Sequence, residues 1–252
     1  MPAVPEGERS PPKPPGAAAW ASAPLLETVP GPAQPQLISD GGGLPFDPAS
    51  LTRAAAALDP QDPAVAALLL QIDRGRQRAQ PARLLRPRAK PTPLPPEVKL
   101  DGWRELARDD EQALFGRGAP PRLLTVAVRR GRGGRWEPLG ASNSRPLRAV
   151  RDGVRASSWR LDPTIRLDPD SPVLHILVTE RTMASGTPVA ERLLAPELYI
   201  DSEAALLRVY VRPLAGYVGR AGRHETPVRV ALPEPLGGRA VLDGALFDPG
   251  SR

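Results

Sequence analysis

Hydrophobic and polar positions alternate along much of the second half of the chain. In RLLTVAVRR, for example, Leu124, Val126 and Val128 fall on every second position, which is typical of a β-strand with one buried face. The glycine-rich GRGG that follows indicates a turn, and RWEPL has the pattern of a returning hairpin strand. Further strand patterns follow in VLHILVTE, LLAPELYI, ALLRVYVRP, PVRVAL and RAVLDG. Short strands separated by Gly and Pro turns, without alternating helices, predict a mainly β, antiparallel and β-sandwich-like fold.

Two stretches before this region have a helical pattern. Asp47-Pro48 and Asp62-Pro63 each place an acidic residue before a proline, a combination favoured at the N-cap and the first helical position. The second pair is followed by PAVAALLLQIDRGRQR. The residues that share one face of this predicted helix are Val65, Leu68, Leu69 and Ile72. That face predicts a helix packed on its own domain, and contact with a partner is the alternative.

A third helix is predicted in GWRELARDDEQALFGRG. The residues on its apolar face are Trp103, Leu106, Ala107 and Leu114. Gly116 or Gly118 would end this helix, because glycine is favoured just after the last helical turn.

Composition divides the chain into three parts. Residues 1–46 are rich in Pro, Gly and Ala without a sustained period, so we predict a disordered arm. Residues 47–97 hold the two short helices and a basic, proline-rich linker that ends in KPTPLPP. Residues 98–252 hold most of the Val, Ile and aromatic side chains and are predicted to form one β-rich globular domain. Removal of the residues before Val98 is expected to leave that domain folded.

The bulk composition excludes several classes of protein. The chain has 252 residues, 34 prolines and no cysteine, which excludes disulfides, thiolate metal sites and cysteine nucleophiles. No apolar run approaches the ~20 residues of a transmembrane helix, so no integral membrane segment is predicted. Near the N-terminus, ASA at residues 21–23 imitates a signal-peptide cleavage site, but the preceding apolar patch is too short and too proline-flanked.

Positive charge gathers in two places in this chain of net charge +6. The first is a basic tract that comprises Arg74, Arg76, Arg78, Arg83, Arg86, Arg88 and Lys90. The second is an arginine-rich loop that comprises Arg129, Arg130, Arg132 and Arg135. Such segments can neutralise phosphates without reading sequence, although no aromatic residue is interleaved in the tract to stack on bases. A solvated linker and a glycine-rich hairpin are the preferred interpretations, and nucleic-acid contact is the alternative.

The residues that could carry chemistry form no catalytic or metal motif. Ser185 would need His175 or His224 as its base and Asp243 as the orienting acid, but the nucleophile elbow G-x-S-x-G is missing. No pair of histidines or spacing of carboxylates indicates a zinc site. Phosphate-loop and dinucleotide fingerprints are also missing. We therefore predict no catalytic residue, no metal and no cofactor.

Two motifs lie between Pro172 and Gly244. The first is ERTMASG, Glu180 to Gly186, directly after a strand pattern. The second comprises Glu234, Pro235, Leu236, Gly237, Arg239, Asp243 and Gly244. In these motifs the chain resembles a family of uncharacterised secreted proteins and lipoproteins of actinobacteria, which carry E-x-x-C-A-S-G and E-P-L-G-x-R-x-x-x-D-G. The resemblance implies a fold and a lineage but no reaction.

The chain departs from this family at its two cysteines, whose places are taken by Met183 and Arg220. Loss of both together is expected if they form one disulfide in the family, so the resemblance implies that these are former disulfide positions. Ser185 and Gly186 then shape a structural turn. Because disulfides bring little benefit in a reducing compartment, we expect a cytoplasmic protein. The alternative is an extracytoplasmic protein with a signal peptide upstream of Met1.

These observations favour a non-enzymatic β-domain protein that binds a protein partner or has a structural role. The alternative function is sequence-nonspecific association with nucleic acid through the basic tract and the arginine-rich loop.

Overall fold

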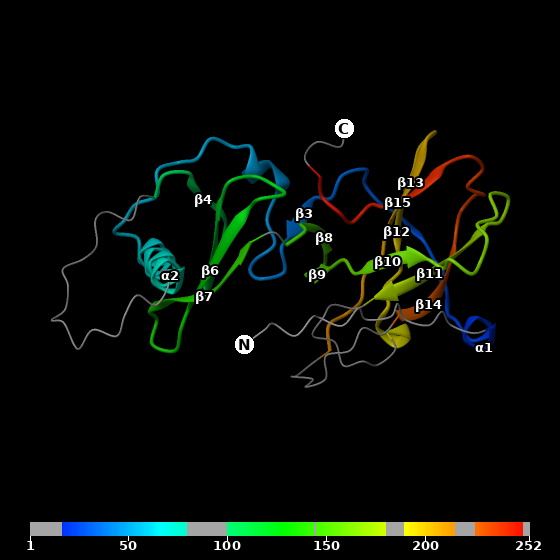
Figure 1. The fold of residues 1–252 in the computed structure, drawn as a ribbon, viewed down its shortest axis with the longest axis horizontal. Helices are drawn as coiled ribbons and strands as arrows, with labels where there is room; N and C mark the ends of the chain where they lie inside the picture. Colours follow the sequence, from blue (N-terminus) through cyan, green and yellow to red (C-terminus); the bar gives the residue numbers. More distant parts are fainter. Residues whose placement is uncertain (1–16, 80–99, 144, 180–188, 215–224, 249–252) are drawn as a thin grey trace, which may run out of the picture. The chain divides into compact units, whose positions relative to one another are not determined.

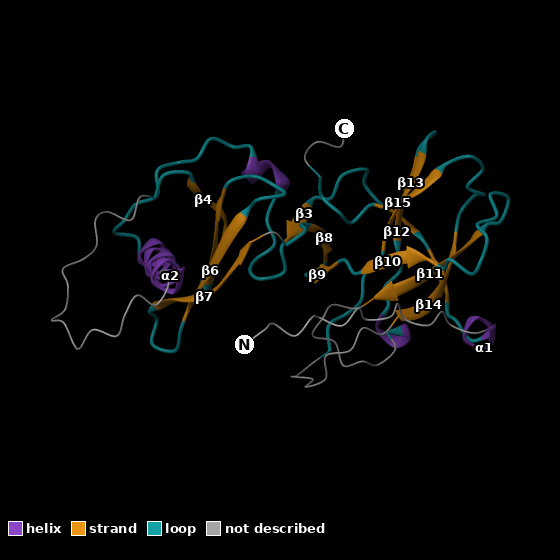
Figure 2. Ribbon diagram, in the orientation of Figure 1, coloured by secondary structure: helices purple, strands orange, loops and turns teal. Residues whose placement is uncertain are grey.

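The computed structural model describes residues 17–79, 100–143, 145–179, 189–214 and 225–248. They form two compact units, each built from stretches that are far apart in sequence. Unit 1 combines Met1–Ala33 with Ala156–Ala245, and unit 2 combines Gln34–Arg155 with Leu246–Arg252. Strands dominate both units (Figures 1 and 2), which confirms the predicted mainly β fold with antiparallel sheets.

Unit 1 contains two four-stranded sheets. The first has the order β1-β14-β11-β10, with β1 at Leu25–Glu27, β14 at Glu225–Ala231, β11 at Val173–Thr179 and β10 at Ser158–Leu161. The second has the order β15-β13-β12-β2, with β15 at Ala240–Asp243, β13 at Ala204–Arg208, β12 at Glu197–Ile200 and β2 at Val29–Pro30. The short α1 (Ala17–Ala21) and the 3-10 helix η2 (Ala190–Arg192) complete the unit. Neighbouring strands are antiparallel except for β1, β2 and β15, which pair in parallel.

One hydrophobic core joins the two sheets of unit 1. Ile176 of β11 and Val228 of β14 are fully buried in the same cluster as Leu198 of β12 and Leu207 of β13. The alternation of buried and partly buried positions along β14 is what a strand with one face on a core requires. The predicted sandwich-like arrangement is therefore confirmed within this unit.

Unit 2 is built on an antiparallel meander. Its order is β4-β5-β6-β7, with β4 at Trp103–Arg108, β5 at Gln112–Arg117, β6 at Leu124–Arg130 and β7 at Trp136–Asn143. A second sheet contains β3 (Leu37–Ser39), β8 (Arg148–Arg151) and β9 (Val154–Arg155). The 3-10 helix η1 spans Pro48–Leu51, and α2 spans Pro63–Ala79 and covers one face of the meander (Figure 1).

Both predicted N-terminal helices are present at the expected positions. Asp47 caps η1 by accepting a hydrogen bond from the Ala49 N–H at 2.8 Å. Asp62 accepts one from the Ala64 N–H at 2.7 Å at the start of α2. The apolar face of α2 packs on its own unit, with Leu68 fully buried against the meander, so the packing interpretation is confirmed.

The helix predicted from Trp103 is wrong, because this segment forms the β4–β5 hairpin. A β-bulge between Glu105 and Ala107 interrupts the pairing and the alternation of faces. Trp103 and Leu106, three residues apart, lie in different hydrophobic clusters on the two faces of the sheet, as an odd separation in a strand requires. The bulge explains why the next residue, Ala107, packs against the same cluster as Leu106. Because both faces of this strand are buried, its apolar residues fall at a spacing that resembles a helical face.

The predicted division into arm, linker and single domain also needs correction. Within residues 1–46, the part from residue 17 onward is folded: β1, β2 and β3 pair with distant strands, and Ile38 is fully buried. The linker assigned to 47–97 includes α2, which is core, while 80–97 lie outside the described residues. The predicted domain 98–252 contributes to both units, because its two halves bury their sheets against different N-terminal segments.

Candidate functional site

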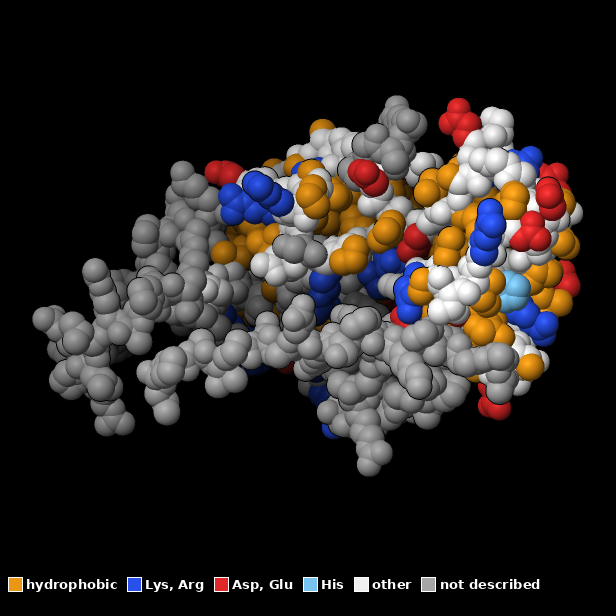
Figure 3. All heavy atoms as spheres, turned by 45° about the vertical axis from the view of Figure 1, so that its right-hand side comes forward, with side chains coloured by type: hydrophobic (Ala, Val, Ile, Leu, Met, Phe, Trp, Pro, Cys, Tyr) orange, Lys and Arg blue, Asp and Glu red, His pale blue; other side chains and the backbone are white. Residues whose placement is uncertain are grey.

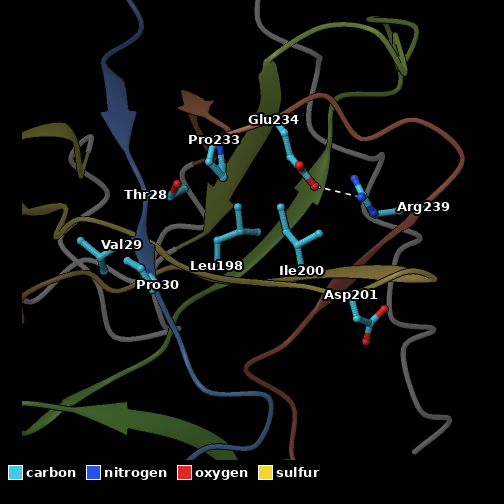
Figure 4. A pocket seen from close by; sticks show the side chains of 9 residues that line it. All are labelled: Thr28, Val29, Pro30, Leu198, Ile200, Asp201, Pro233, Glu234 and Arg239. Carbon is cyan, nitrogen blue, oxygen red and sulfur yellow. Dashed lines mark ion pairs between the residues drawn. The ribbon is translucent and has the colours of Figure 1, made fainter.

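A pocket of about 400 Å³ opens in unit 1 beside the hydrophobic core. Leu198 and Ile200 of β12 form its apolar floor (Figure 4). The residues that line it are Thr28, Val29, Pro30, Leu198, Ile200, Asp201, Pro233, Glu234 and Arg239. The pocket thus draws on three segments of the chain, two of which carry no strand pattern that the sequence reveals.

The wall of the pocket is the segment that passes from β1 in one sheet to β2 in the other. The Val29 N–H donates to the Pro196 carbonyl at 2.9 Å, and the Gly31 N–H donates to the Leu198 carbonyl at 2.9 Å. The Thr28 hydroxyl donates to the Ala231 carbonyl at 3.1 Å. These bonds fix the segment as an edge strand, a position where Pro30 costs no sheet hydrogen bond.

The rim of the pocket is built by the loop from Glu234 to Arg239. Arg239 Nη2 forms an ion pair with Glu234 Oε1 at 2.8 Å, and Arg239 Nη1 donates to the Pro235 carbonyl at 3.2 Å. Gly237 has φ of 60°, the left-handed region that favours glycine, and Leu236 is buried. The E-P-L-G-x-R motif therefore forms a turn closed by an ion pair, and its two charged residues face the pocket region.

Asp201 lies on the same side of the pocket as Arg239, in the turn between β12 and β13 (Figure 4). Its Oδ1 accepts hydrogen bonds from the N–H groups of Glu203 and Ala204, each at 2.8 Å. These two bonds, helped by the charge of Arg239, hold the pKa of the Asp201 carboxyl below its usual value. In Figure 4 its carboxylate is turned away from the floor formed by Leu198 and Ile200. Asp201 therefore contributes charge at the rim rather than a contact on the floor.

His175 is engaged in a separate cluster of unit 1. Its ring lies 5.0 Å from the Trp20 ring, nearly edge to face, and Trp20 Nε1 donates to Asp162 Oδ2 at 2.9 Å. Burial, together with the nearby charge of Arg229, lowers the pKa of His175, and Asp162 opposes this. These contacts anchor α1 to the sheet.

Of the other residues considered for chemistry, the structure describes Asp243. Asp243 Oδ1 accepts a hydrogen bond from the Ala245 N–H at 3.1 Å. Ser185 and His224 lie outside the described residues, as do Met183 and Arg220, where we expected the former disulfide. Among the described side chains, no three His, Asp or Glu residues gather as metal ligands.

The arginine-rich loop is a hairpin turn between β6 and β7, as preferred. The Gly131 N–H donates to the Arg135 carbonyl at 2.8 Å, and Gly133 and Gly134 have φ of 116° and 76°. Arg129 pairs with Glu137 at 3.3 Å. Arg130 Nε donates to the Gly134 carbonyl at 3.2 Å, and the two remaining arginines, Arg132 and Arg135, are exposed.

The structure places acidic residues beside this loop. The β4–β5 turn contains Asp109, Asp110 and Glu111, and the Arg130 N–H donates to the Glu111 carbonyl at 2.6 Å. The sequence reasoning missed this proximity because it assigned the acidic turn to a helix. The positive charge at the tip is therefore partly offset by neighbouring carboxylates.

The part of the basic tract that the structure describes begins on α2, away from the loop. The N-terminal end of α2 lies near the loop, because Asp62 pairs with Arg108 at 2.9 Å and Arg108 lies 5.9 Å from the Trp136 ring centroid. Arg74 is exposed about 18 Å further along the helix axis. Arg76 and Arg78 also belong to α2, and the tract residues that lie outside the described ranges are Arg83, Arg86, Arg88 and Lys90. On the face drawn in Figure 3, basic side chains are scattered rather than gathered over one element.

Comparisons with known proteins do not identify a function for these sites. No protein-family model matches the chain, and neither the curated proteins nor the solved structures contain a match. Within the described ranges, no helix combines the length and the hydrophobicity that a bilayer crossing requires.

Proposed function

We propose that this chain is a non-enzymatic β protein that binds a protein partner, and that the pocket of unit 1 receives a segment of that partner. The observation that supports the proposal is the pocket itself. Its volume of about 400 Å³ falls in the range of ligand sites, and its floor is apolar while its rim carries charged side chains.

The pocket is open to solvent, as a site for a partner segment must be. Pro30 on the wall is exposed, and the Glu234 side chain on the rim is 52% exposed. An apolar centre with a polar, solvent-accessible rim is the usual anatomy of a protein interface. Pro30, which pairs with Leu198, and the floor residues Leu198 and Ile200 would contact an apolar side chain of the partner segment.

A lysine at Pro30 tests this proposal, because Pro30 pairs with Leu198 and its side chain lies on the same face of the sheet. We expect peptides selected from a random displayed library on the full-length chain to bind Pro30→Lys about tenfold more weakly, because the charged side chain reaches over the apolar floor. The matched control is Leu242→Lys, since Leu242 is 49% exposed on β15 and does not line the pocket. Both positions are exposed enough that each variant should unfold within about 0.5 kcal/mol of the parent. Peptides that bind both variants equally, or a selection that yields none, would reject the pocket as the partner site.

The second candidate function is sequence-nonspecific contact with nucleic acid through the arginine-rich loop and the basic tract. It is supported by Arg132 and Arg135, which are exposed and whose side chains make no hydrogen bond or ion pair with the described residues. The neighbouring acidic turn at Asp109–Glu111 limits the strength of this contact.

A salt titration on the full-length chain tests that candidate. We expect binding to mixed-sequence RNA at about 50 mM salt that is lost near about 200 mM, because phosphate contacts release counterions. Replacing Arg132 and Arg135 by Gln should reduce the binding, whereas Asp110→Asn should increase it by removing a nearby carboxylate. Fluorescence anisotropy measures all three proteins. If none of them binds even at low salt, the loop is a solvated hairpin and nothing more.

A further inference from the structure

The charges around the pocket of unit 1 indicate which partner segment it takes. We infer that the pocket selects a segment in which a Lys or Arg side chain adjoins an apolar residue. This inference rests on the proposed function and specifies its ligand.

The balance of charge in the pocket is negative. Its lining contains two carboxylates, Asp201 and Glu234, against one guanidinium, Arg239. Glu203, two residues beyond Asp201 in the β12–β13 turn, is exposed and adds a third carboxylate beside the rim. The whole chain carries a net charge of +6, so this local excess of acid runs against its overall composition. A cationic group would be attracted to this rim and an anionic group repelled.

Arg239 does not offer an anion a ready site. Its Nη2 pairs with Glu234 at 2.8 Å, and its Nη1 is directed to the Pro235 and Leu236 carbonyls at 3.2 and 3.5 Å. An anionic ligand would have to displace Glu234 from this arrangement. A cationic ligand would not, because Glu234 Oε2 and Asp201 Oδ2 accept no hydrogen bond from the described part of the chain.

One long side chain of the partner segment could pack on the apolar floor and also reach Glu234. Figure 4 shows Glu234 directed from the loop toward the side of the pocket where Ile200 and Arg239 lie. Lys and Arg have long apolar stems that pack on hydrophobic surface while the charged head stays in water. The stem would lie on Leu198 and Ile200, and the head would meet Glu234. A neighbouring apolar residue of the segment would contact Pro30, which pairs with Leu198.

Three peptides that differ in one side chain test the inference. The probes are Ac-Gly-Leu-Lys-Leu-Gly-NH2 and its counterparts with Gln or Glu in place of Lys. They are titrated against the ¹⁵N-labelled full-length chain, and the amide resonances of Ile200, Asp201 and Arg239 report on the pocket. We expect the Lys peptide to shift these amides and to bind about fivefold more tightly than the Gln peptide, as an exposed ion pair allows. The Glu peptide should bind most weakly.

Two variants decide whether Glu234 is responsible. Glu234→Gln should reduce the Lys-over-Gln preference to about twofold or less, because it removes the carboxylate charge and leaves Arg239 without its ion-pair partner. Glu111→Gln removes the same charge from an exposed position in unit 2 and should leave the preference unchanged. Equal binding of the Lys and Gln peptides, with the same amides shifted, would overturn the cation preference and leave the pocket as a partner site. If no peptide shifts these amides, the proposed function fails as well.

Discussion

A chain that begins at Val98 is expected to lose cooperative thermal unfolding in both units. In unit 2 this truncation removes α2 and the residues that cover the other face of the meander. The fully or nearly fully buried side chains lost are Ile38, Phe46, Leu51, Val65 and Leu68. Their burial is worth on the order of 10 kcal/mol, which is as large as the whole stability of a typical domain. The sequence-based expectation that this truncation is harmless is therefore reversed.

A second truncation separates the two units. A chain that begins at Gln34 keeps the described elements of unit 2 but loses β1 and β2 of unit 1. It should retain the thermal transition of unit 2 and lose that of unit 1, as measured by differential scanning calorimetry. Native-like transitions in the Val98 chain would show that the N-terminal segments are dispensable and would contradict the packing described above.

The sequence predicted those elements whose periodicity is local. The strand at β6 shows its period in Leu124, Val126 and Val128, and α2 shows both a capping acid and an apolar face. β1, β2 and β3 contain only two or three residues each, which is too few to display a period. They form strands because segments remote in sequence offer them hydrogen-bond partners. The residues of these short strands do not by themselves reveal that pairing.

The pocket could not be predicted for the same reason. Its lining comes from residues 28–30, 198–201 and 233–239, which no spacing along the chain connects. The only signal was the E-P-L-G-x-R motif, which we used as evidence of lineage. In the structure Glu234 and Arg239 of that motif form an ion pair on the rim. An acidic and a basic residue on either side of a glycine turn form a pattern that is visible in the sequence, and it could have been proposed as part of a binding site.

The N-terminal segment of unit 1 is fastened by a buried arginine. Arg208 is completely inaccessible, and it donates to the carbonyls of Pro32 at 2.6 Å, Ala33 at 2.8 Å and Gly244 at 2.7 Å. Glu197 Oε2 lies 3.8 Å from its Nη1. Burial lowers the pKa of this guanidinium, and Tyr210 and Glu197 oppose the shift. One side chain thus ties β13 to the ends of two segments that are remote in sequence.

Arg208→Met is expected to destabilise unit 1 by about 3–5 kcal/mol. The substitution keeps an apolar stem of similar length but leaves three carbonyls without a donor and Glu197 without its cationic neighbour. Chemical denaturation followed by circular dichroism measures the change in unfolding free energy. The matched control is Arg160→Met. Arg160 also uses its guanidinium group in hydrogen bonds, two of them to the Glu225 carboxylate, but its side chain is 41% exposed. That variant should lose about 1 kcal/mol or less. Equal losses of unfolding free energy in the two variants would mean that the buried hydrogen bonds of Arg208 stabilise unit 1 no more than an exposed ion pair does. The N-terminal segment would then be held by the pairing of its short strands.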